Sequence, residues 1–488
     1  METAVRVGGG ELKIARGKPW APDLGSTMDI FAGQDKNWVM NMIGFRKVAW
    51  SSLAATMVLM FTLLTLWCRP CQARTYIDIN APYLRKIPTA IPFFKNVGIQ
   101  EQEAHLAVSL SNILQETLNF TGFFKMLDRQ SFLEVSQEAG LTRNTINFQN
   151  WTAVGAELLF KGAFQYQGDI LEIECRLFDT FGGNLLLGKR YTGRLNDQRL
   201  MIHRFCDDVI LRLTGRRGIF TSKIAFVSTT TGNKEIYVSD FDGDNQRQFT
   251  KSGAITLFPA WSSDGKWLAY TDYGRGRPNL FISQIRGKQD AVVSLKGSSI
   301  TPAWVPGEFV LAASLSYEGN PMIYLLTGTG KIVKKLTRHW GIDVAPTWSP
   351  DGKAFAFVSN RSGSPQIYIK EIESENVRRL TFEGKYNTAP AWSPRGHYIA
   401  YAGSNDGHFD IFVIGLDGLK GAIQLTHEAG NNESPTWSPD GTLIAFSSDR
   451  EGPYRIYVMN ARGTNQRRLL ELKGEQTNPS WSPRLGGD

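Results

Sequence analysis

The residues that could carry chemistry in this chain are six histidines, four cysteines and a set of Asp-Gly pairs. A serine hydrolase would need the pentad Gly-x-Ser-x-Gly, and a zinc peptidase would need His-Glu-x-x-His, and neither occurs. The histidines are scattered, with no two at metal-ligand spacing. The Asp-Gly pairs do not have the several carboxylates of a calcium loop, so they are interpreted as turn residues. We therefore expect no catalytic residue, no metal and no cofactor.

A column of polar residues says more about function than these histidines, cysteines and Asp-Gly pairs. It stands three positions before a repeated proline, in six copies, and consists of Thr256, Ser299, Asp343, Asn387, Asn432 and Gln476. If the strand that follows is the innermost of a propeller blade, the column lies near the axis at one mouth of the central tunnel. A partner segment could satisfy such a ring of donors and acceptors. Alternatively, the ring hydrogen-bonds neighbouring blades or tunnel water.

The proline belongs to a phrase, Pro-x-Trp, that recurs through the C-terminal two thirds of the chain. Its tryptophans, 261, 304, 348, 392, 437 and 481, are separated by 43, 44, 44, 45 and 44 residues. A period near 44 is typical of propeller blades. The tryptophans themselves are interpreted as core between blades. Each period also contains short runs such as Ile-Ala-Phe, Ile-Tyr-Val and Arg-Leu-Thr between turn residues, which indicates four antiparallel strands.

The phase of the repeat predicts how the ring closes. The array opens on the strand at Ile224 and ends on the strand at Trp481, so its first unit has no Pro-x-Trp strand before it. Pairing the last strand with the first three would remove two exposed sheet edges. We expect a six-bladed propeller over residues 219–483, with a first blade made of residues 223–250 and 478–483.

The N-terminal part reads as three segments. Residues 1–44 are an uncertain extension, which would not belong to the protein if its reading frame begins further downstream. Residues 45–73 have a positive flank, an apolar core and a small residue at the end, as in a secretory signal cleaved after Ala73. The core is nearly long enough to span a bilayer, so an uncleaved anchor is the alternative.

Residues 74–215 do not follow the repeat and predict a small α/β domain. An amphipathic helix is expected near residues 100–118, and three strands are expected between residues 158 and 191. After export, Cys175 and Cys206 could form a disulfide or remain as buried thiols. The net charge of +8 is spread thinly and forms no Lys/Arg-rich cluster, which favours a solvated surface over a nucleic-acid site.

This order of parts resembles the TolB family, periplasmic propeller proteins of the Tol-Pal system of Gram-negative bacteria. The resemblance rests on the repeat Pro-x-Trp-Ser-Pro-Asp-Gly, on Lys223-Ile-Ala-Phe-Val at the domain junction and on the sequence from Val238 to Asn245. It covers about residues 74–483. The export signal and the absence of a hydrolase distinguish the chain from peptidase propellers that share the repeat.

The resemblance implies a non-enzymatic, monomeric protein of the periplasm that touches membranes only through its partners. It implies binding of the peptidoglycan-associated lipoprotein Pal at the propeller mouth and of TolA through the mature N-terminus, in support of outer-membrane invagination at division and outer-membrane integrity. The Pal contacts of the family match Ser298, Ser299 and Thr301, and Asp343 with Val344. The TolA segment corresponds to Arg74, Thr75, Tyr76, Ile77 and Asp78.

Two other functions stay open on the sequence alone. The chain could be a propeller subunit, or the remnant of a peptidase-like exported protein, that acts with a separate catalytic chain. It could also be a scaffold with no dedicated axial ligand, if its own loops plug the tunnel mouth.

Overall fold

The computed structural model describes residues 85–98, 104–133, 140–287, 290–293, 295–404, 406–417 and 421–485. The expected signal segment and the segment Arg74 to Asp78 lie outside these residues. Within the described part of the chain, none of the helices is both long and apolar enough to cross a membrane.

The first folded region is an α/β domain, as the sequence predicts. Its sheet has the order β3-β1-β4-β5-β6, with β2 paired to β4. Strand β1 runs parallel to β3 and β4, whereas β4, β5 and β6 form an antiparallel meander. The elements are β1 (Ile87–Ala90), β2 (Lys95–Asn96), α2 (Ala104–Phe120), β3 (Phe124–Met126), α3 (Phe148–Ala153), β4 (Leu158–Gln167), β5 (Ile170–Asp179), β6 (Asn184–Arg194) and α4 (Gln198–Thr214).

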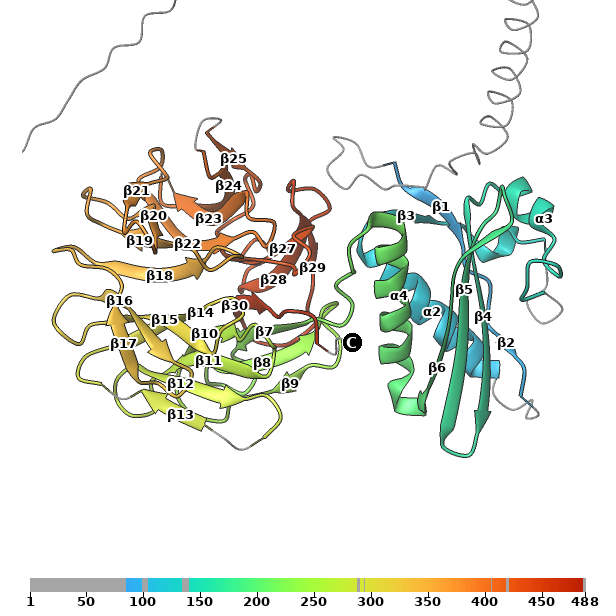
Figure 1. Ribbon diagram of the computed structural model, residues 1–488, viewed down its shortest axis with the longest axis horizontal. Helices are drawn as coiled ribbons and strands as arrows, with labels where there is room; N and C mark the ends of the chain where they lie inside the picture. Colours follow the sequence, from blue (N-terminus) through green and yellow to red (C-terminus); the bar gives the residue numbers. More distant parts are fainter. Residues whose placement is uncertain are drawn as a thin grey trace, which may run out of the picture. The chain divides into compact units, whose positions relative to one another are not determined.

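Two helices form the second layer of this domain. Figure 1 shows α2 and α4 side by side against the sheet, and the two helices are in contact. The apolar face of α2, with Leu110 and Leu114, packs into the same core as Phe160 of β4 and Phe205 of α4. Apolar residues spaced three and four apart on α2 produce this buried stripe. Helix α4 ends at Gly215, whose φ of 78° provides a left-handed cap.

The two cysteines of the domain are both free and buried. Cys175 lies on β5 and Cys206 on α4, and both belong to the core between the sheet and the helices. Burial raises the pKa of both thiols above its ordinary value, so they remain protonated at neutral pH. Of the two alternatives, the structure has the buried thiols.

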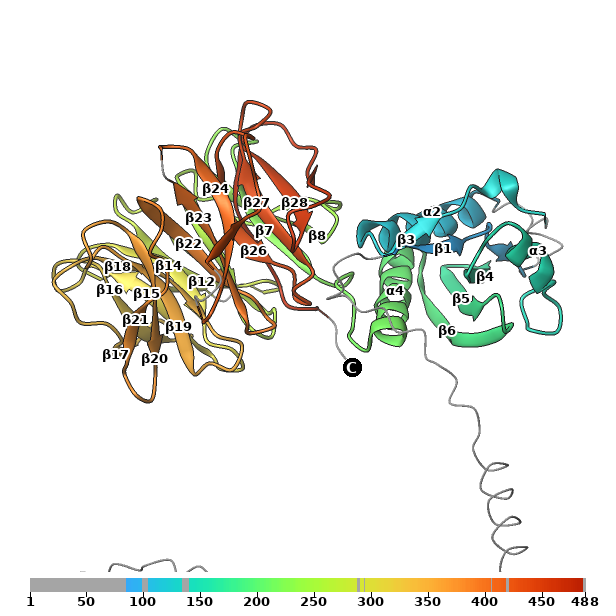
Figure 2. The same ribbon diagram turned by 90° about the horizontal axis from the view of Figure 1, so that it is seen from above.

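The second folded region is a six-bladed β-propeller, again as predicted. Every blade is a four-stranded antiparallel sheet, and the innermost strands contact one another in a closed ring (Figure 2). From the inner to the outer strand, blade 1 has β30 (Gln476–Trp481), β7 (Lys223–Ser228), β8 (Glu235–Asp240) and β9 (Arg247–Gln248). Blade 2 has β10 (Thr256–Trp261), β11 (Trp267–Asp272), β12 (Asn279–Gln284) and β13 (Asp290–Val293). Blade 3 has β14 (Ser299–Trp304), β15 (Val310–Leu315), β16 (Met322–Thr327) and β17 (Ile332–Lys335).

The remaining blades follow the same order. Blade 4 has β18 (Asp343–Trp348), β19 (Ala354–Ser359), β20 (Gln366–Glu371) and β21 (Val377–Arg379). Blade 5 has β22 (Tyr386–Trp392), β23 (Tyr398–Ser404), β24 (Phe409–Gly415) and β25 (Ala422–Gln424), and blade 6 has β26 (Asn432–Trp437), β27 (Leu443–Ser448), β28 (Arg455–Asn460) and β29 (Arg467–Arg468).

Blade 1 joins the two ends of the array. The last strand, β30, pairs antiparallel with β7, with Gln476 opposite Ser228 and Trp481 opposite Ile224. A covered edge replaces the open edges that a linear stack of sheets would present.

The repeated Asp and Thr residues stabilise the blades locally. In the turn after Trp348, the Asp351 carboxylate accepts a hydrogen bond from the Ser349 hydroxyl at 2.6 Å and one from the Lys353 backbone N–H at 3.1 Å. The threonine that follows the outer strand stabilises the blade through its hydroxyl. The Thr381 hydroxyl accepts the backbone N–H of Ile367 at 2.9 Å and donates to the Gln366 side chain at 2.8 Å.

Candidate functional site

The propeller has two faces, and the chain direction assigns the loops to them. Each inner strand begins at the mouth, where the loop from the previous blade arrives, and ends at its tryptophan. Because the strands of a blade are antiparallel, the turn between the second and third strands also lies at the mouth. The Ser-Pro-Asp-Gly turns lie at the opposite face, called here the turn face.

The polar column predicted from the sequence lies at the start of the inner strands, but it is buried. All six of its side chains are at most 1% exposed. They hydrogen-bond within the propeller: the Asn387 amide donates to Gln366 at 2.8 Å, and the Gln476 amide donates to the Gly474 carbonyl at 2.8 Å. The column is thus hydrogen-bonded inside the propeller, and through Asn387 and Gln366 it joins blades 5 and 4; contact of the column with Pal stays a prediction.

Asp343 is paired inside its own blade, blade 4. Its carboxylate is fully buried, and both of its oxygens accept hydrogen bonds from one nitrogen of Arg361 at 3.0 Å. The guanidinium lies over the rings of Phe357 and Tyr368, with centroid distances of 5.2 and 4.9 Å. A buried carboxylate needs such a partner, because an unpaired charge in the interior is costly.

Blade 6 has the same arrangement with a neutral asparagine in place of the aspartate. Arg450 donates to the Asn432 side-chain oxygen at 2.9 Å and lies over the ring of Tyr457 at 4.5 Å. Burial lowers the pKa of Arg450 from its ordinary value. Two arginines at matching places of two blades therefore anchor the start of their inner strands.

Next to the column, each inner strand contains a bulge. The residue before the repeated proline has a positive φ in all six blades, between 48° and 56°, and the strand register shifts there. Such a conformation is uncommon outside glycine, and it is strained for the β-branched Thr301. These residues are only half-buried: Phe258, Thr301, Ala345, Ala389, Ser434 and Asn478.

Of the remaining predicted contact residues, Ser298, Thr301 and Val344 are half-buried. The Ser298 backbone N–H donates to the Ser316 hydroxyl at 2.7 Å. The Thr301 hydroxyl shares a hydrogen bond with the Ser314 hydroxyl at 2.7 Å and accepts the Ala345 backbone N–H at 3.2 Å. Thr301 thus joins blades 3 and 4, and the structure brings Ser298, Thr301 and Val344 to neighbouring inner strands.

Among its exposed residues the mouth carries several large apolar side chains. Large side chains stand out from its loops and turns between blades 1 and 5, and we call this set the rim: Ile255, Tyr317, Trp340, Ile342, Phe382 and Tyr386. Trp340 is 72% exposed and Phe382 is 73% exposed. The sequence analysis missed the rim, although aromatic residues in loops that follow the Leu-Thr strand ends were a usable signal.

The loop that carries Trp340 is held by its backbone. The Asn320 side chain donates to the Trp340 carbonyl at 2.7 Å, and the backbone N–H of Ile342 donates to the Asn360 side chain at 2.7 Å. The His339 ring packs against the indole with centroids 5.1 Å apart. An exposed aromatic group on a fixed backbone loses little entropy when it is buried against a partner.

The Phe382 ring is supported in a similar way. The guanidinium of Arg379 lies over it at 4.9 Å and also donates to the Thr381 carbonyl at 2.6 Å. Exposed, well-supported aromatic residues are the groups on which protein interfaces depend most. In the described residues, no group of three His, Cys, Asp or Glu side chains is placed to hold a metal ion. The chemistry that the rim offers is therefore apolar contact with a macromolecule.

Both folded regions of the chain match known protein families. Residues 210–485 match the family profile of the TolB beta propeller domain, and residues 75–186 match that of the TolB amino-terminal domain. The chain is 52% identical to the Tol-Pal system protein TolB of Desulfosudis oleivorans over 54% of this chain and 61% of that protein, which is less than two thirds of its length.

Longer matches extend into the α/β domain. The chain is 43% identical to the protein TolB homolog of Chlorobium luteolum over 77% of this chain and 86% of that protein. Among solved structures, TolB from Acinetobacter baumannii superposes with a TM-score of 0.70 at 26% identity, over 82% of this chain and 97% of that one.

Proposed function

Because the chain belongs to the TolB family, we propose that it is a non-enzymatic protein-binding component of the Tol-Pal system and works in the periplasm. Its partners are the peptidoglycan-associated lipoprotein Pal, at the propeller mouth, and TolA. Its role is to support outer-membrane invagination during cell division and the integrity of that membrane.

The observation that carries the Pal proposal is the rim. Trp340 and Phe382 stand on the loops that lead into blades 4 and 5, beside the inner strands that contain Thr301 and Val344. Burial of an indole contributes about 2–3 kcal/mol at roughly 25 cal/mol per Å². Two such anchors on fixed loops are enough to dominate the affinity of one interface. The buried column positions these strands.

Calorimetric titration with the soluble domain of Pal from the same organism tests this proposal. We expect saturable binding to the wild type and a loss of at least 100-fold in affinity for the double variant Trp340→Ala/Phe382→Ala. The control is Ile423→Ala, which removes another exposed apolar side chain, from the outer strand β25. Unchanged affinity of the double variant would place the Pal site elsewhere.

The proposed TolA contact is the segment Arg74, Thr75, Tyr76, Ile77 and Asp78, which lies outside the described residues. Deletion of these five residues should abolish capture by immobilised TolA and leave the affinity for Pal unchanged. Loss of both activities would argue against separate sites. In cells, the same deletion should increase sensitivity to detergent, as expected for a weakened outer membrane.

A further inference from the structure

The exposed charges of the mouth are separated by sign around the ring of blades. The inner strands contact one another in the order β10, β14, β18, β22, β26 and β30, and β30 contacts β10 again. In a closed ring of six blades, blade 2 therefore lies across the tunnel from blade 5, and blade 3 lies across from blade 6. The loops at these two sides of the mouth carry charges of opposite sign.

One side of the mouth is positive. We call the loops of residues 251–255, 273–278 and 295–298, around blades 2 and 3, the cationic sector. These loops contain no acidic residue and four exposed cations: Lys251, Arg275, Arg277 and Lys296. Among the described residues, neither Lys251 nor Lys296 has an ion-pair partner. Their charges are therefore available to a molecule that covers the mouth.

The other side is mainly negative. We call the loops of residues 406–408, 427–431, 449–454 and 471–475, around blades 5 and 6, the anionic sector. Two cations, Arg450 and Lys473, stand there against six carboxylates: Asp406, Glu428, Asp449, Glu451, Glu471 and Glu475. Arg450 points inward, since it donates to the side chains of Asn432 at 2.9 Å and Gln466 at 2.8 Å.

The inner strands follow the same division. The residue after the column is apolar on blades 2 to 4 and polar on blades 5, 6 and 1, namely Leu257, Ile300 and Val344, then Thr388, Glu433 and Thr477. In the six described inner strands, Glu433 is the one charged residue besides the buried Asp343. The Tyr454 hydroxyl donates to Glu433 at 2.6 Å. Burial raises the pKa of Tyr454, and so do this hydrogen bond and the nearby carboxylates of Asp449 and Glu475.

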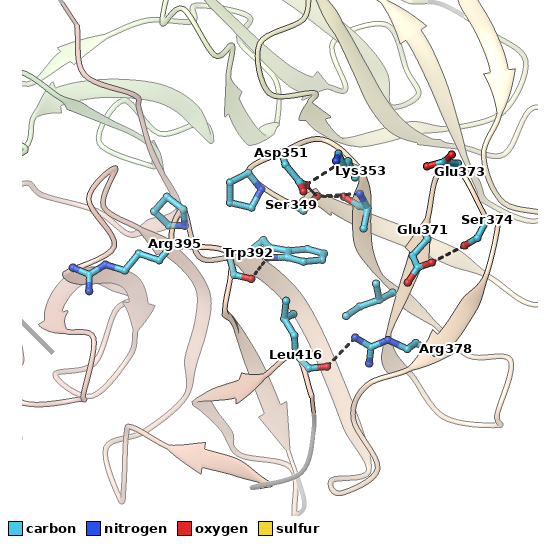
Figure 3. A pocket seen from close by; sticks show the side chains of 15 residues that line it. Ser349, Asp351, Lys353, Glu371, Glu373, Ser374, Arg378, Trp392, Arg395 and Leu416 are labelled. Atoms are coloured by element: carbon cyan, nitrogen blue, oxygen red, sulfur yellow. Dashed lines mark hydrogen bonds between the residues drawn. The ribbon is translucent and has the colours of Figure 1, made fainter. Parts of the chain in front are cut away.

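A pocket at the turn face has a different distribution of charge. Three cations and three carboxylates line this pocket together, beside Trp392: Lys353, Arg378, Arg395, Asp351, Glu371 and Glu373. Figure 3 shows Lys353 next to Asp351, with Arg378 and Glu371 on one side of the pocket. Neighbouring charges of opposite sign cancel at a distance, whereas charges kept on opposite sides of a surface produce a field across it. The mouth is of the second kind.

The aromatic residues of the rim lie between the two sectors. Trp340 and Phe382 stand on the loops into blades 4 and 5, which follow Lys296 and precede Asp406 around the ring. A protein that covers the rim must therefore meet positive charge on one side and negative charge on the other. Complementary charges of this kind accelerate the encounter of two proteins and fix their relative orientation.

We propose that the mouth is bipolar and binds Pal in a single orientation, with an acidic side of Pal over the cationic sector and a basic side over the anionic sector. This inference rests on the proposed Pal site and adds to it: the rim provides affinity, and the two sectors provide orientation and speed of association. Each sector is assembled from loops of different blades, so no run of Lys, Arg, Asp or Glu marks it in the sequence.

Stopped-flow mixing of the protein with the soluble domain of Pal from the same organism tests the proposal. Association is measured at about 0.01 M and about 1 M salt, where the screening length is about 30 Å and about 3 Å. The two variants are Lys251→Glu/Lys296→Glu and Glu428→Lys/Glu475→Lys. Each should slow association at least about fivefold at low salt and less than about twofold at high salt, with a smaller change in the dissociation rate.

A matched control carries the same change of charge away from the mouth. Lys331→Glu/Lys334→Glu alters two exposed lysines at the outer strand β17 and changes the net charge as much as Lys251→Glu/Lys296→Glu does. Its association rate should stay within about twofold of the wild type. Thermal unfolding of every variant is measured alongside, and we expect little change because the substituted side chains are exposed or half-buried.

A mouth that attracts Pal through net charge alone would respond with opposite signs: one reversal would slow association and the other would accelerate it. That result would overturn the proposal, as would rates that neither reversal changes or that the control lowers equally. If the wild type does not bind Pal, the proposed function fails and the bipolar mouth fails with it. Binding at a rate that salt does not change leaves the proposed function in place and removes only the bipolar mouth.

Discussion

The inner polar column and the apolar rim lie at the same mouth of the propeller, yet they have opposite environments. The column is buried and makes internal hydrogen bonds such as that of Asp343 with Arg361. The rim is exposed and carries Trp340 and Phe382 on loops with a fixed backbone. Buried polar residues therefore stabilise this mouth, and the exposed apolar residues of the rim are available for binding.

The difference follows from the position of each residue along the strand. A residue at the start of an inner strand lies between two neighbouring blades, where a polar side chain must find an internal partner. A residue in the loop before it is outside the blades and can expose an apolar side chain at little cost. Substitutions in the column should consequently change stability, and substitutions in the rim should change affinity.

The largest effect is expected for Asp343→Ala. It leaves the Arg361 guanidinium as a largely buried charge without its carboxylate, which should lower the free energy of unfolding by about 3–5 kcal/mol. Chemical denaturation of the purified protein measures this loss. The double variant Asp343→Leu/Arg361→Leu should regain part of it, because no unpaired charge remains. A loss below about 1 kcal/mol for Asp343→Ala would contradict the expected role of the column in stability.

The rule for buried polar groups extends to the α/β domain through His203 of α4. Burial, assisted by Arg199, lowers its pKa to about 3 in the folded protein. Because the unfolded histidine titrates near pH 6.5, this group's contribution to stability is present above that pH and is lost as the pH falls toward 3. Asp207 opposes it: burial raises its pKa to about 6, which favours the folded state as the pH falls.

Replacement of His203 by leucine should therefore protect the protein from acid. Between pH 7 and pH 4.5, the wild type should lose roughly 3 kcal/mol of stability that His203→Leu retains. Denaturation curves at the two pH values give this difference directly. If both proteins lost the same free energy of unfolding between pH 7 and pH 4.5, His203 would not titrate as its burial requires.

Trp340→Ala tests whether the rim determines affinity. We expect about a 30-fold loss of affinity for Pal, near 2 kcal/mol, with the free energy of unfolding within about 0.5 kcal/mol of the wild type. Titration and denaturation of the same preparation measure both quantities. A parallel fall in stability would mean that the indole supports its loop instead of binding a partner.

The smallest effects are expected for two adjacent residues, Thr381 and Phe382. Thr381 is buried and hydrogen-bonded, whereas Phe382 is 73% exposed. Thr381→Val should lower stability by about 1–2 kcal/mol without changing affinity for Pal. Phe382→Ala should lower that affinity about fivefold to tenfold without changing stability. The reverse pattern for either residue would contradict the division between buried polar residues and the rim.

The sequence by itself determined the architecture of this protein. The spacing of six tryptophans predicted six blades, and the absence of that period before residue 215 predicted a separate α/β domain. These properties could be predicted because each blade repeats the same local pattern of strands and turns. The helix expected near residues 100–118 also appears, as α2 over Ala104–Phe120, since its apolar period is local.

Only the tertiary structure decided which mouth residues are exposed and how neighbouring blades are joined. The column at Asn387 and the rim at Phe382 are separated by five residues, and polarity alone did not predict that Asn387 is buried and Phe382 is exposed. The position of Trp392 depends on the hydroxyl of Thr347, 45 residues earlier in the chain, in the neighbouring blade. Contacts of this kind arise only when neighbouring blades pack together, because they join groups that no local pattern brings together.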